Sequence, residues 1–285
     1  MIEQSKVFHY FRTISSIGEI IPYGEFKQIH SIFDRNINFL NNELIVTVSN
    51  ASSYEGVLRI VIPDLDLPKV KTIEHHPGKI IINGYKNFLY EEEVGYDPSL
   101  PQMYLRSNTL FRELSNLKTI YLAKDKKYSL ACLLNQENEK IPEISSYYSE
   151  LMKQMNHAFR SLKEGNYPLA VKGFKGRGYG LTPSGDDFLI GFLIGLSFRE
   201  HLEDRTVTNL KQEIYRLALG SNLLVNTFLF EAINGYYNSY WKSFLTKLIR
   251  GTGDVMVDFE AILSVGETSG YDTMAGFLTC CEMDI

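Results

Sequence analysis

The spacing of hydrophobic and polar positions changes about halfway along this chain of 285 residues. In the first half, short β-branched runs stand between polar turns, as in Glu43–Ser49, Val57–Asp64 and Lys79–Gly84. Such runs predict short strands, and they look antiparallel because they lack the strand–helix alternation of a doubly wound sheet. The segment Lys118–Leu134 has two apolar stretches around Lys124–Lys126, which predicts a hairpin.

The second half has a helical spacing. Tyr148, Leu151, Met152, Met155 and Phe159 recur at helical intervals, and Gly165 ends that pattern. Further helices are expected at about 185–202, 207–219, 222–234, 238–250, 254–264 and 270–281. We therefore expect an α+β protein, with a β-rich N-terminal domain over residues 1–135 and a mostly α-helical C-terminal domain over residues 145–285. The polar, proline-containing segment Asn135–Ile144 is the predicted linker.

One decapeptide pattern occurs twice in the helical half. The sequence SGDDFLIGFL begins at Ser184, and SGYDTMAGFL begins at Ser269, with six of the ten positions identical. Each serine suits a helix N-cap, and Asp187 and Asp272 would then sit at the third helical position, near the positive end of the helix dipole. A glycine inside a helix costs about 1 kcal/mol relative to alanine, so Gly191 and its equivalent predict close helix–helix contact. Two well-capped core helices would account for these residues without any site.

A glycine-rich loop precedes the first copy of the pattern. Gly173, Gly176, Gly178 and Gly180 alternate with the basic residues Lys172, Lys175 and Arg177. Glycines let backbone N–H groups converge, and a helix N-terminus behind them favours an anion such as a phosphate or carboxylate. The loop matches neither the Walker pattern nor the dinucleotide-binding pattern, because Tyr179 and Leu181 stand where those patterns need other residues.

Two pseudo-symmetric helix N-termini could face one shared pocket. Asp186, Asp187 and Asp272 would then crowd it together with the two serines. Carboxylates repel an anion, so they would either hold a divalent metal such as Mg²⁺ or accept hydrogen bonds from a substrate amide or hydroxyl. The residue pattern leaves this choice open; if a metal binds, Asp186 and Asp187 are its candidate ligands.

Composition and charge narrow the class of protein. The net charge is −5, which argues against a nucleic-acid partner. The cysteines, Cys132, Cys280 and Cys281, form no Cys-x-x-Cys pair, so a zinc site is not expected, and their number fits a reducing cytoplasm. The longest apolar run, Phe188–Phe198, is too short to span a bilayer. We expect a cytoplasmic, soluble protein with no secretory signal and no membrane partner.

The pattern GxGxGLTPSGDDFLxG, followed later by GxTSGxDTxxG, resembles the AllH-like family, which includes a subunit of the oxamate carbamoyltransferase of anaerobic allantoin breakdown. The resemblance covers residues 173–196 and 263–278 and is looser over 223–235. The N-terminal half does not match residue by residue. Family members often carry Gly-His where this chain has Gly266 and Glu267, which puts a catalytic or ligand role at that position in doubt.

The resemblance implies carbamoyl transfer between carbamoyl phosphate and oxamate, in either direction, with partner subunits that complete the site. Asp187, Asp272 and Asp186 are then the expected catalytic residues, which orient the amide nitrogen or act as its base. The expected substrate-binding residues are those of the loop and the two turns: Lys175, Gly176, Arg177, Gly178, Gly180, Thr182, Ser184, Gly185, Ser269 and Gly270. The small anionic substrate would be held by the loop amides and Lys175 or Arg177.

Two other functions remain open: a non-catalytic regulatory subunit that binds a metabolite, and a metal-dependent phosphoryl-group enzyme with Asp186 and Asp187 on Mg²⁺. The adjacent His75 and His76 point to opposite faces if they lie on a strand, and a surface turn is the default expectation for them. His157 and His201 are expected to be structural, and Cys280 and Cys281 to be buried in packing.

Overall fold

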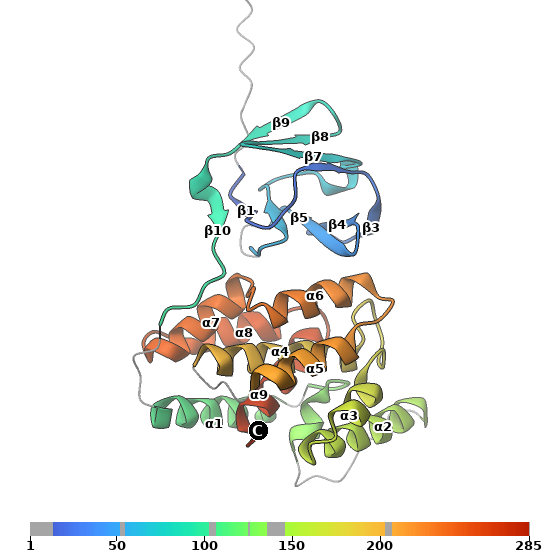
Figure 1. Cartoon of the computed structure of the whole chain (residues 1–285), viewed down its shortest axis with the longest axis vertical. Coiled ribbons are helices and arrows are strands. Elements are labelled where there is room, and N and C mark those ends of the chain that lie inside the picture. Colours follow the sequence, from blue (N-terminus) through green and yellow to red (C-terminus); the bar gives the residue numbers. More distant parts are fainter. Residues whose placement is uncertain are drawn as a thin grey trace, which may run out of the picture. The chain divides into compact units, whose positions relative to one another are not determined.

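The computed structural model of the chain describes residues 14–51, 55–102, 107–124, 126–135, 146–202 and 207–284. The chain divides into two compact units, residues 1–97 and 98–285. Strands make up the first unit and helices dominate the second, so the predicted α+β class is confirmed (Figure 1). Most of the predicted linker lies outside the described residues.

The first unit contains two sheets. The larger has six strands in the order β10 (Gly95–Tyr96), β1 (Ser16–Gly18), β6 (Arg59–Val61), β5 (Leu44–Ser49), β4 (Asn36–Asn41) and β3 (Ile29–Ile32). The smaller has four, in the order β2 (Gly24–Phe26), β7 (Ile73–His76), β8 (Lys79–Ile82) and β9 (Lys86–Leu89). Short 3₁₀ turns, η1 (Leu67–Lys69) and η2 (Glu92–Val94), connect strands.

Strand pairing in this unit is mixed. The antiparallel expectation holds for most pairs, but β5 pairs with β6 in parallel, and so does β1 with β10. Strand β6 is also shorter than the predicted Val57–Asp64 run. The apolar residues of that run are nevertheless buried, including those beyond the ends of β6. A buried apolar run of this length predicts a strand over its whole length, although only Arg59–Val61 form one.

The histidine pair lies on β7. His75 is buried while His76 is exposed, so the two side chains do point to opposite faces. His75 is not at a surface turn: its Nδ1 is 3.1 Å from the Pro22 carbonyl oxygen and its Nε2 is 2.7 Å from the Tyr90 hydroxyl. Burial lowers the pKa of His75, and these contacts satisfy both ring nitrogens.

The predicted hairpin at Lys118–Leu134 is wrong. Helix α1 (Ser107–Ala123) occupies its first half, and the 3₁₀ turn η3 (Leu130–Leu134) its second. Leu110, Leu114, Leu117 and Tyr121 bury one face of α1. This helical period starts well before Lys118, and a window that begins at Lys118 contains too little of it to be told from a strand.

The other helices agree with the predicted ranges to within one or two residues at each end. They are α2 (Ser146–Lys163), α4 (Ser184–His201), α5 (Thr208–Ala218), α6 (Leu223–Ile233), α7 (Ser239–Arg250), α8 (Val255–Leu263) and α9 (Ser269–Glu282). The short helix α3 (Tyr167–Phe174) precedes the glycine-rich loop. Asn222, Asn238 and Asp254 cap α6, α7 and α8 with side-chain oxygens, as the sequence favours.

Helix α4 is the centre of the helical core. Every residue from Gly185 to Phe198 is buried, because α3, α5, α6 and α9 all pack against it. Cys280 and Cys281 of α9 are buried in the same core, as predicted, and burial raises the pKa of Cys281 to about 12.

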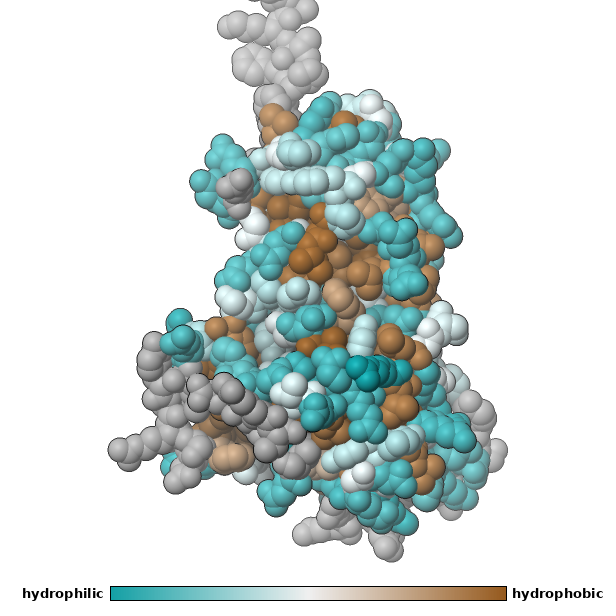
Figure 2. All heavy atoms as spheres, in the orientation of Figure 1, coloured by the Kyte–Doolittle hydropathy of each residue, from teal (hydrophilic) through white to brown (hydrophobic). Residues whose placement is uncertain are grey.

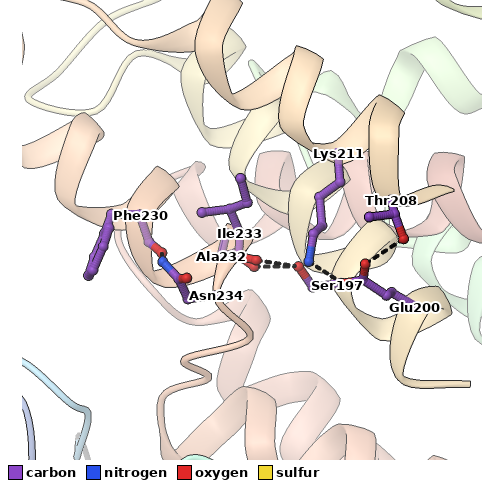
Figure 3. Close-up of polar contacts among 8 residues, drawn as sticks. All are labelled: Ser197, Glu200, Thr208, Lys211, Phe230, Ala232, Ile233 and Asn234. Atoms are coloured by element: carbon purple, nitrogen blue, oxygen red, sulfur yellow. Dashed lines mark hydrogen bonds and ion pairs between the residues drawn. The ribbon is translucent and has the colours of Figure 1, made fainter. Parts of the chain in front are cut away.

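Polar contacts hold the C-terminal half of α4 in place (Figure 3). The Ser197 hydroxyl donates to the Ala232 carbonyl oxygen at 2.6 Å, near the end of α6. Glu200 accepts hydrogen bonds from Thr208, at 2.7 Å, and from Lys211, which joins α4 to α5.

Among the described residues, no helix combines the length and apolarity needed to cross a membrane. The face drawn in Figure 2 carries hydrophilic and hydrophobic residues side by side over the helical unit.

Candidate functional site

The two copies of the repeated pattern pack directly against each other. A Cβ on Gly191 of α4 would lie 1.7 Å from the Thr273 carbonyl oxygen of α9, and a Cβ on Gly276 would lie 1.9 Å from the Phe188 carbonyl oxygen of α4. Thr273 and Phe188 are themselves equivalent positions of the repeat, so the contact is reciprocal. Farther along, Gly195 meets Cys280, which shows that α4 and α9 run parallel with their N-termini at the same end.

The repeat extends to the helices before the two patterns. A Cβ on Gly185 would lie 2.0 Å from the carbonyl oxygen of Phe174, near the end of α3, and a Cβ on Gly270 would lie 2.0 Å from that of Ile262, near the end of α8. The Gly185 amide donates to the Arg177 carbonyl oxygen at 2.8 Å. Its equivalent, the Gly270 amide, donates to the Val265 carbonyl oxygen at 3.0 Å.

The unit α3–loop–α4 therefore corresponds to α8–loop–α9. The helices of each unit approach at backbone distance, which only glycine permits at these positions.

The first loop is the longer of the two, with residues 175–183 against 264–268. Gly176, Gly178 and Gly180 all have positive φ angles, of 69°, 122° and 90°. A Cβ on Gly178 would lie 2.4 Å from the Ser184 amide nitrogen, so this position requires glycine for space as well as conformation.

Two predicted anion ligands of this loop are held by other groups. The Lys175 Nζ donates to the carbonyl oxygens of Leu217, at 3.1 Å, and Leu219, where α5 ends. The Gly176 amide donates to the Asp186 carboxylate at 2.9 Å. Asp186 therefore secures the loop to the first turn of α4. Burial raises the pKa of Asp186, while the Gly176 hydrogen bond and Lys175 oppose that rise.

The predicted serine caps are wrong by one residue. Pro183 and Thr268 occupy the N-cap positions of α4 and α9, neither with a side-chain cap hydrogen bond, and Ser184 and Ser269 are the first helical residues. The Asp187 and Asp272 amides donate to the carbonyl oxygens of these N-cap residues, at 3.0 and 2.8 Å. The serine hydroxyls are consequently not used to cap their own helices.

The hydroxyls instead connect the two turns. Thr182 Oγ1, before α4, and Ser269 Oγ, of α9, lie 3.2 Å apart. Thr182 Oγ1 also donates to Asp187 Oδ2 at 3.2 Å, and the Ser269 hydroxyl favours the ionised form of Asp187. In the same reciprocal way, the Ser184 hydroxyl favours the ionised form of Asp272. Each aspartate is thus close to the serine of the other repeat.

Asp272 has a partner that no sequence pattern indicates. The Leu130 amide, at the start of η3, donates to Asp272 Oδ1 at 2.6 Å. Oδ2 is buried and has no hydrogen-bond partner among the described residues. The Ser184 and Thr268 hydroxyls partly oppose the rise in the pKa of Asp272 that burial causes.

The electrostatics of the site favour neutral acids. Burial raises the pKa of Asp272 to about 7. Burial also raises the pKa of Asp187 well above its usual value, and the Asp272 charge adds to the rise. Asp186, Asp187 and Asp272 are 4%, 4% and 0% exposed, so they lie beneath the two turns.

The surface above these acids consists of loop backbone and hydroxyls. Gly176 and Gly180 are exposed, and the half-buried predicted residues are Lys175, Arg177, Gly178, Thr182, Ser184 and Ser269. Gly185 and Gly270 are buried in the helix contacts described above. Glu267 is exposed on the second loop.

Sequence reasoning missed Thr268, near Asp272, and Asn222. The Asn222 side-chain amide donates to the Leu181 carbonyl oxygen at 2.7 Å, while its oxygen caps α6. Asparagine directly before an apolar helix predicts the cap, but the contact with the loop depends on tertiary structure.

The carboxylates do not form a recognisable metal centre. Asp186 and Asp187 are successive residues of a helix, and one Asp186 oxygen accepts from Gly176. Within the described ranges, no group of three or more His, Cys, Asp or Glu side chains is arranged to hold a metal ion.

Comparison with known proteins gives one match. No curated protein and no solved structure matches the chain. A family model, described as oxamate carbamoyltransferase subunit AllH, matches residues 174–281. That stretch begins at the last residue of α3 and includes both copies of the pattern, the loop and the helices between them. The resemblance seen in the sequence is therefore confirmed over residues 174–281, which are similar to the AllH family.

Proposed function

We propose that this chain is one subunit of a carbamoyltransferase that moves a carbamoyl group between phosphate and the amide nitrogen of oxamate. The match to the AllH family supports the reaction class and the subunit role. The observation that carries the proposal for the site is the Thr182–Ser269 contact, which places hydroxyls of both repeats above two buried acids.

Neutral acids remove the main objection to an anion at this place. Ionised carboxylates would repel carbamoyl phosphate, oxamate and oxalurate alike. Because burial raises the pKa of Asp187 and of Asp272, the site carries less negative charge near neutral pH than its sequence suggests. The parallel N-termini of α4 and α9 then add their positive dipole ends in the same direction.

In the direction of phosphorolysis, a phosphate oxygen attacks the carbamoyl carbon of oxalurate. The bond from that carbon to the oxamate nitrogen breaks, and the nitrogen takes up a proton, which gives carbamoyl phosphate and oxamate. We assign substrate contact to Thr182, Ser184 and Ser269, together with the loop backbone at Gly178–Gly180. Asp187 and Asp272 lie behind the hydroxyls, where they would supply or accept the proton through them.

The roles within the loop are divided. Asp186 would fix the loop through Gly176, and Lys175 would fix it against the end of α5. These two residues are therefore proposed as positioning residues.

The burial of all three carboxyl groups favours a second candidate function, a non-catalytic subunit that binds a metabolite. In that case the turns would bind carbamoyl phosphate or oxamate, and chemistry would occur on a partner subunit.

A metal-dependent phosphoryl-group enzyme is the third candidate. Calorimetry with Mg²⁺ on the wild type and on Asp187→Asn would test it, with a difference between the two expected only if Asp187 holds the ion.

The main test is phosphorolysis of oxalurate by the purified chain, alone and together with candidate partner subunits. We expect turnover with partners present, and a loss of about 10²-fold or more for Ser269→Ala and Asp187→Asn. The matched control is Ser115→Ala, an exposed serine on α1, which should leave the rate unchanged. Absence of turnover in every combination of folded subunits would contradict the catalytic role and favour the binding subunit.

A further inference from the structure

A surface groove lies between α2 and α3, which run side by side in the helical unit (Figure 1). Its volume is about 510 Å³, and its lining residues include Glu150, Lys153 and His157 of α2, Lys172 and Gly173 of α3, and Arg177 of the glycine-rich loop. The functional assignment above uses neither α2 nor α3.

The groove has a close-packed helix pair beneath it. A Cβ on Gly173 would lie 2.5 Å from the Cβ of Ala158, so α2 and α3 approach nearly to backbone contact at this point. Small residues at the crossing leave the longer side chains around it to form the walls. The position of these walls is therefore set by rigid helix packing.

The charge of the groove is positive. Glu150 is the acidic member of its lining, and it is already engaged by Lys153 at 3.8 Å and by the Gln154 side-chain amide at 3.4 Å. Lys172 and Arg177 have no carboxylate partner among the described residues. Two cations are thus left for a ligand, with His157 beside them.

Arg177 gives the second indication of a ligand. Its Nε is shielded from solvent yet has no hydrogen-bond partner among the described residues. A buried N–H group without an acceptor is unfavourable, and such groups usually receive a bound water or ion. Guanidinium groups preferentially bind oxyanions, because their planar N–H groups match two oxygens at once.

The backbone of Arg177 is fixed on both sides. Its amide donates to the Phe174 carbonyl oxygen at 3.0 Å, and its carbonyl oxygen accepts from the Gly185 amide at 2.8 Å. The loop therefore presents the guanidinium group to the groove from an anchored position, which lowers the entropy lost when an anion binds.

We propose that the α2/α3 groove binds the oxyanion group, phosphate or carboxylate, of a small molecule, with Arg177 and Lys172 as its principal contacts. This site is separate in its residues from the hydroxyls of Thr182 and Ser269, and it does not depend on carbamoyl chemistry. A ligand there would also connect α2 and α3 to the first residues of the glycine-rich loop.

The test is calorimetric titration of the chain alone, at constant ionic strength and pH 7, with inorganic phosphate in one arm and oxamate in the other. We expect Arg177→Gln to weaken binding at least about 10-fold and Lys172→Gln several-fold. Phosphate binding without oxamate binding identifies a phosphate ligand, and the reverse identifies a carboxylate.

Two control variants make the outcome decisive. Lys127→Gln removes an exposed lysine outside the groove, and Ser115→Ala changes an exposed serine of α1. Both should bind the anion as the wild type does. Equal weakening by Lys127→Gln would show general charge attraction, and unchanged binding by Arg177→Gln would show that the anion binds elsewhere; either result overturns the proposal. So does the absence of binding in both arms.

The assay needs no partner subunit and no turnover. Failure of the carbamoyltransferase proposal therefore leaves this result unaffected, and the two proposals can fail independently.

Discussion

Thr182 and Ser269 are 87 positions apart in the sequence, yet their hydroxyl oxygens lie 3.2 Å apart. One belongs to the loop before α4 and the other to the first turn of α9. Their contact joins the two copies of the repeat at the helix N-termini, above Asp187 and Asp272. Since Thr182 also donates to Asp187, a hydrogen-bonded chain passes from one repeat to the acid of the other.

This contact predicts energetic coupling between the two residues. The free energies of unfolding of Thr182→Val, Ser269→Ala and the double variant should deviate from additivity by about 0.5–1.5 kcal/mol, because either single change already removes the shared hydrogen bond. Denaturant unfolding followed by circular dichroism measures all three. Strictly additive effects would show that the hydroxyls do not interact in solution.

The glycines of the α4–α9 contact predict an order of stability losses. Gly191→Ala and Gly276→Ala bring a methyl group into a backbone carbonyl and should each cost about 3 kcal/mol or more. Gly195→Ala would meet the Cβ of Cys280 at 2.6 Å and should cost less, since this approach is less close. Thermal unfolding gives the order.

Val257→Ala, an exposed change on α8, is the control for these variants and should stay within about 0.5 kcal/mol of the wild type. Because the repeat is reciprocal, Gly191→Ala and Gly276→Ala should be similar in magnitude. A mild effect at one and a severe effect at the other would argue against the symmetry.

Asp272 predicts a pH dependence of stability. Burial raises its pKa from 3.8 to about 7 in the folded state, so the folded chain binds more protons than the unfolded chain between these values. Its contribution to stability is therefore fully present at low pH and is lost as the pH rises through about 7. Asp187, whose pKa burial also raises, acts in the same direction.

Asp272→Asn keeps the shape and the acceptor for the Leu130 amide but does not ionise. Its melting temperature should change less than that of the wild type between pH 5 and pH 8. At pH 8 the variant should be the more stable of the two, by up to a few kcal/mol. Parallel pH profiles for the two proteins would mean that Asp272 does not titrate in this range.

Asp186 predicts the order of the glycine-rich loop. Asp186→Ala removes the acceptor of the Gly176 amide, and the loop should open more often because its three positive-φ glycines favour many conformations. Limited trypsin digestion should then cleave after Lys175 or Arg177 several times faster than in the wild type, as mass spectrometry of the fragments would show. Glu213→Ala, on α5, is the control; equal cleavage rates in all three proteins would contradict the role given to Asp186.

The Glu200–Lys211 pair predicts unequal effects of its two neutral variants (Figure 3). The Lys211 side chain is 9% exposed and that of Glu200 is 31% exposed. Glu200→Gln leaves a buried ammonium without its partner, whereas Lys211→Met leaves a carboxylate that water reaches. The first should therefore cost more, by about 1–3 kcal/mol, in denaturant unfolding. Equal losses, or the reverse order, would mean that water already solvates Lys211.

Local sequence determined most of the helical unit. Seven predicted helices agree with the structure because their apolar positions recur over stretches longer than an ordinary strand, and Asn222, Asn238 and Asp254 cap three of them. The repeat is also evident in the sequence. Gly191 and Gly276 occupy the same position of each copy, and each lies against a backbone carbonyl of the other helix. Helix α1 is the exception for a local reason: Lys118–Ala123 alone is too short to show the helical period and favours a strand.

Tertiary structure decided what the sequence left open at the site. The pattern places Ser184, Asp187, Ser269 and Asp272 on two helix N-termini but not beside one another; the parallel packing of α4 and α9 brings them together. Their burial, the raised pKa values and the Leu130 contact follow from this packing, because desolvation depends on every element around a carboxyl group and not on its neighbours in the chain. The same holds for Lys175 and Arg177, whose basic side chains predict anion binding equally. In the fold, Lys175 is hydrogen-bonded to the end of α5, whereas Arg177 lines the α2/α3 groove.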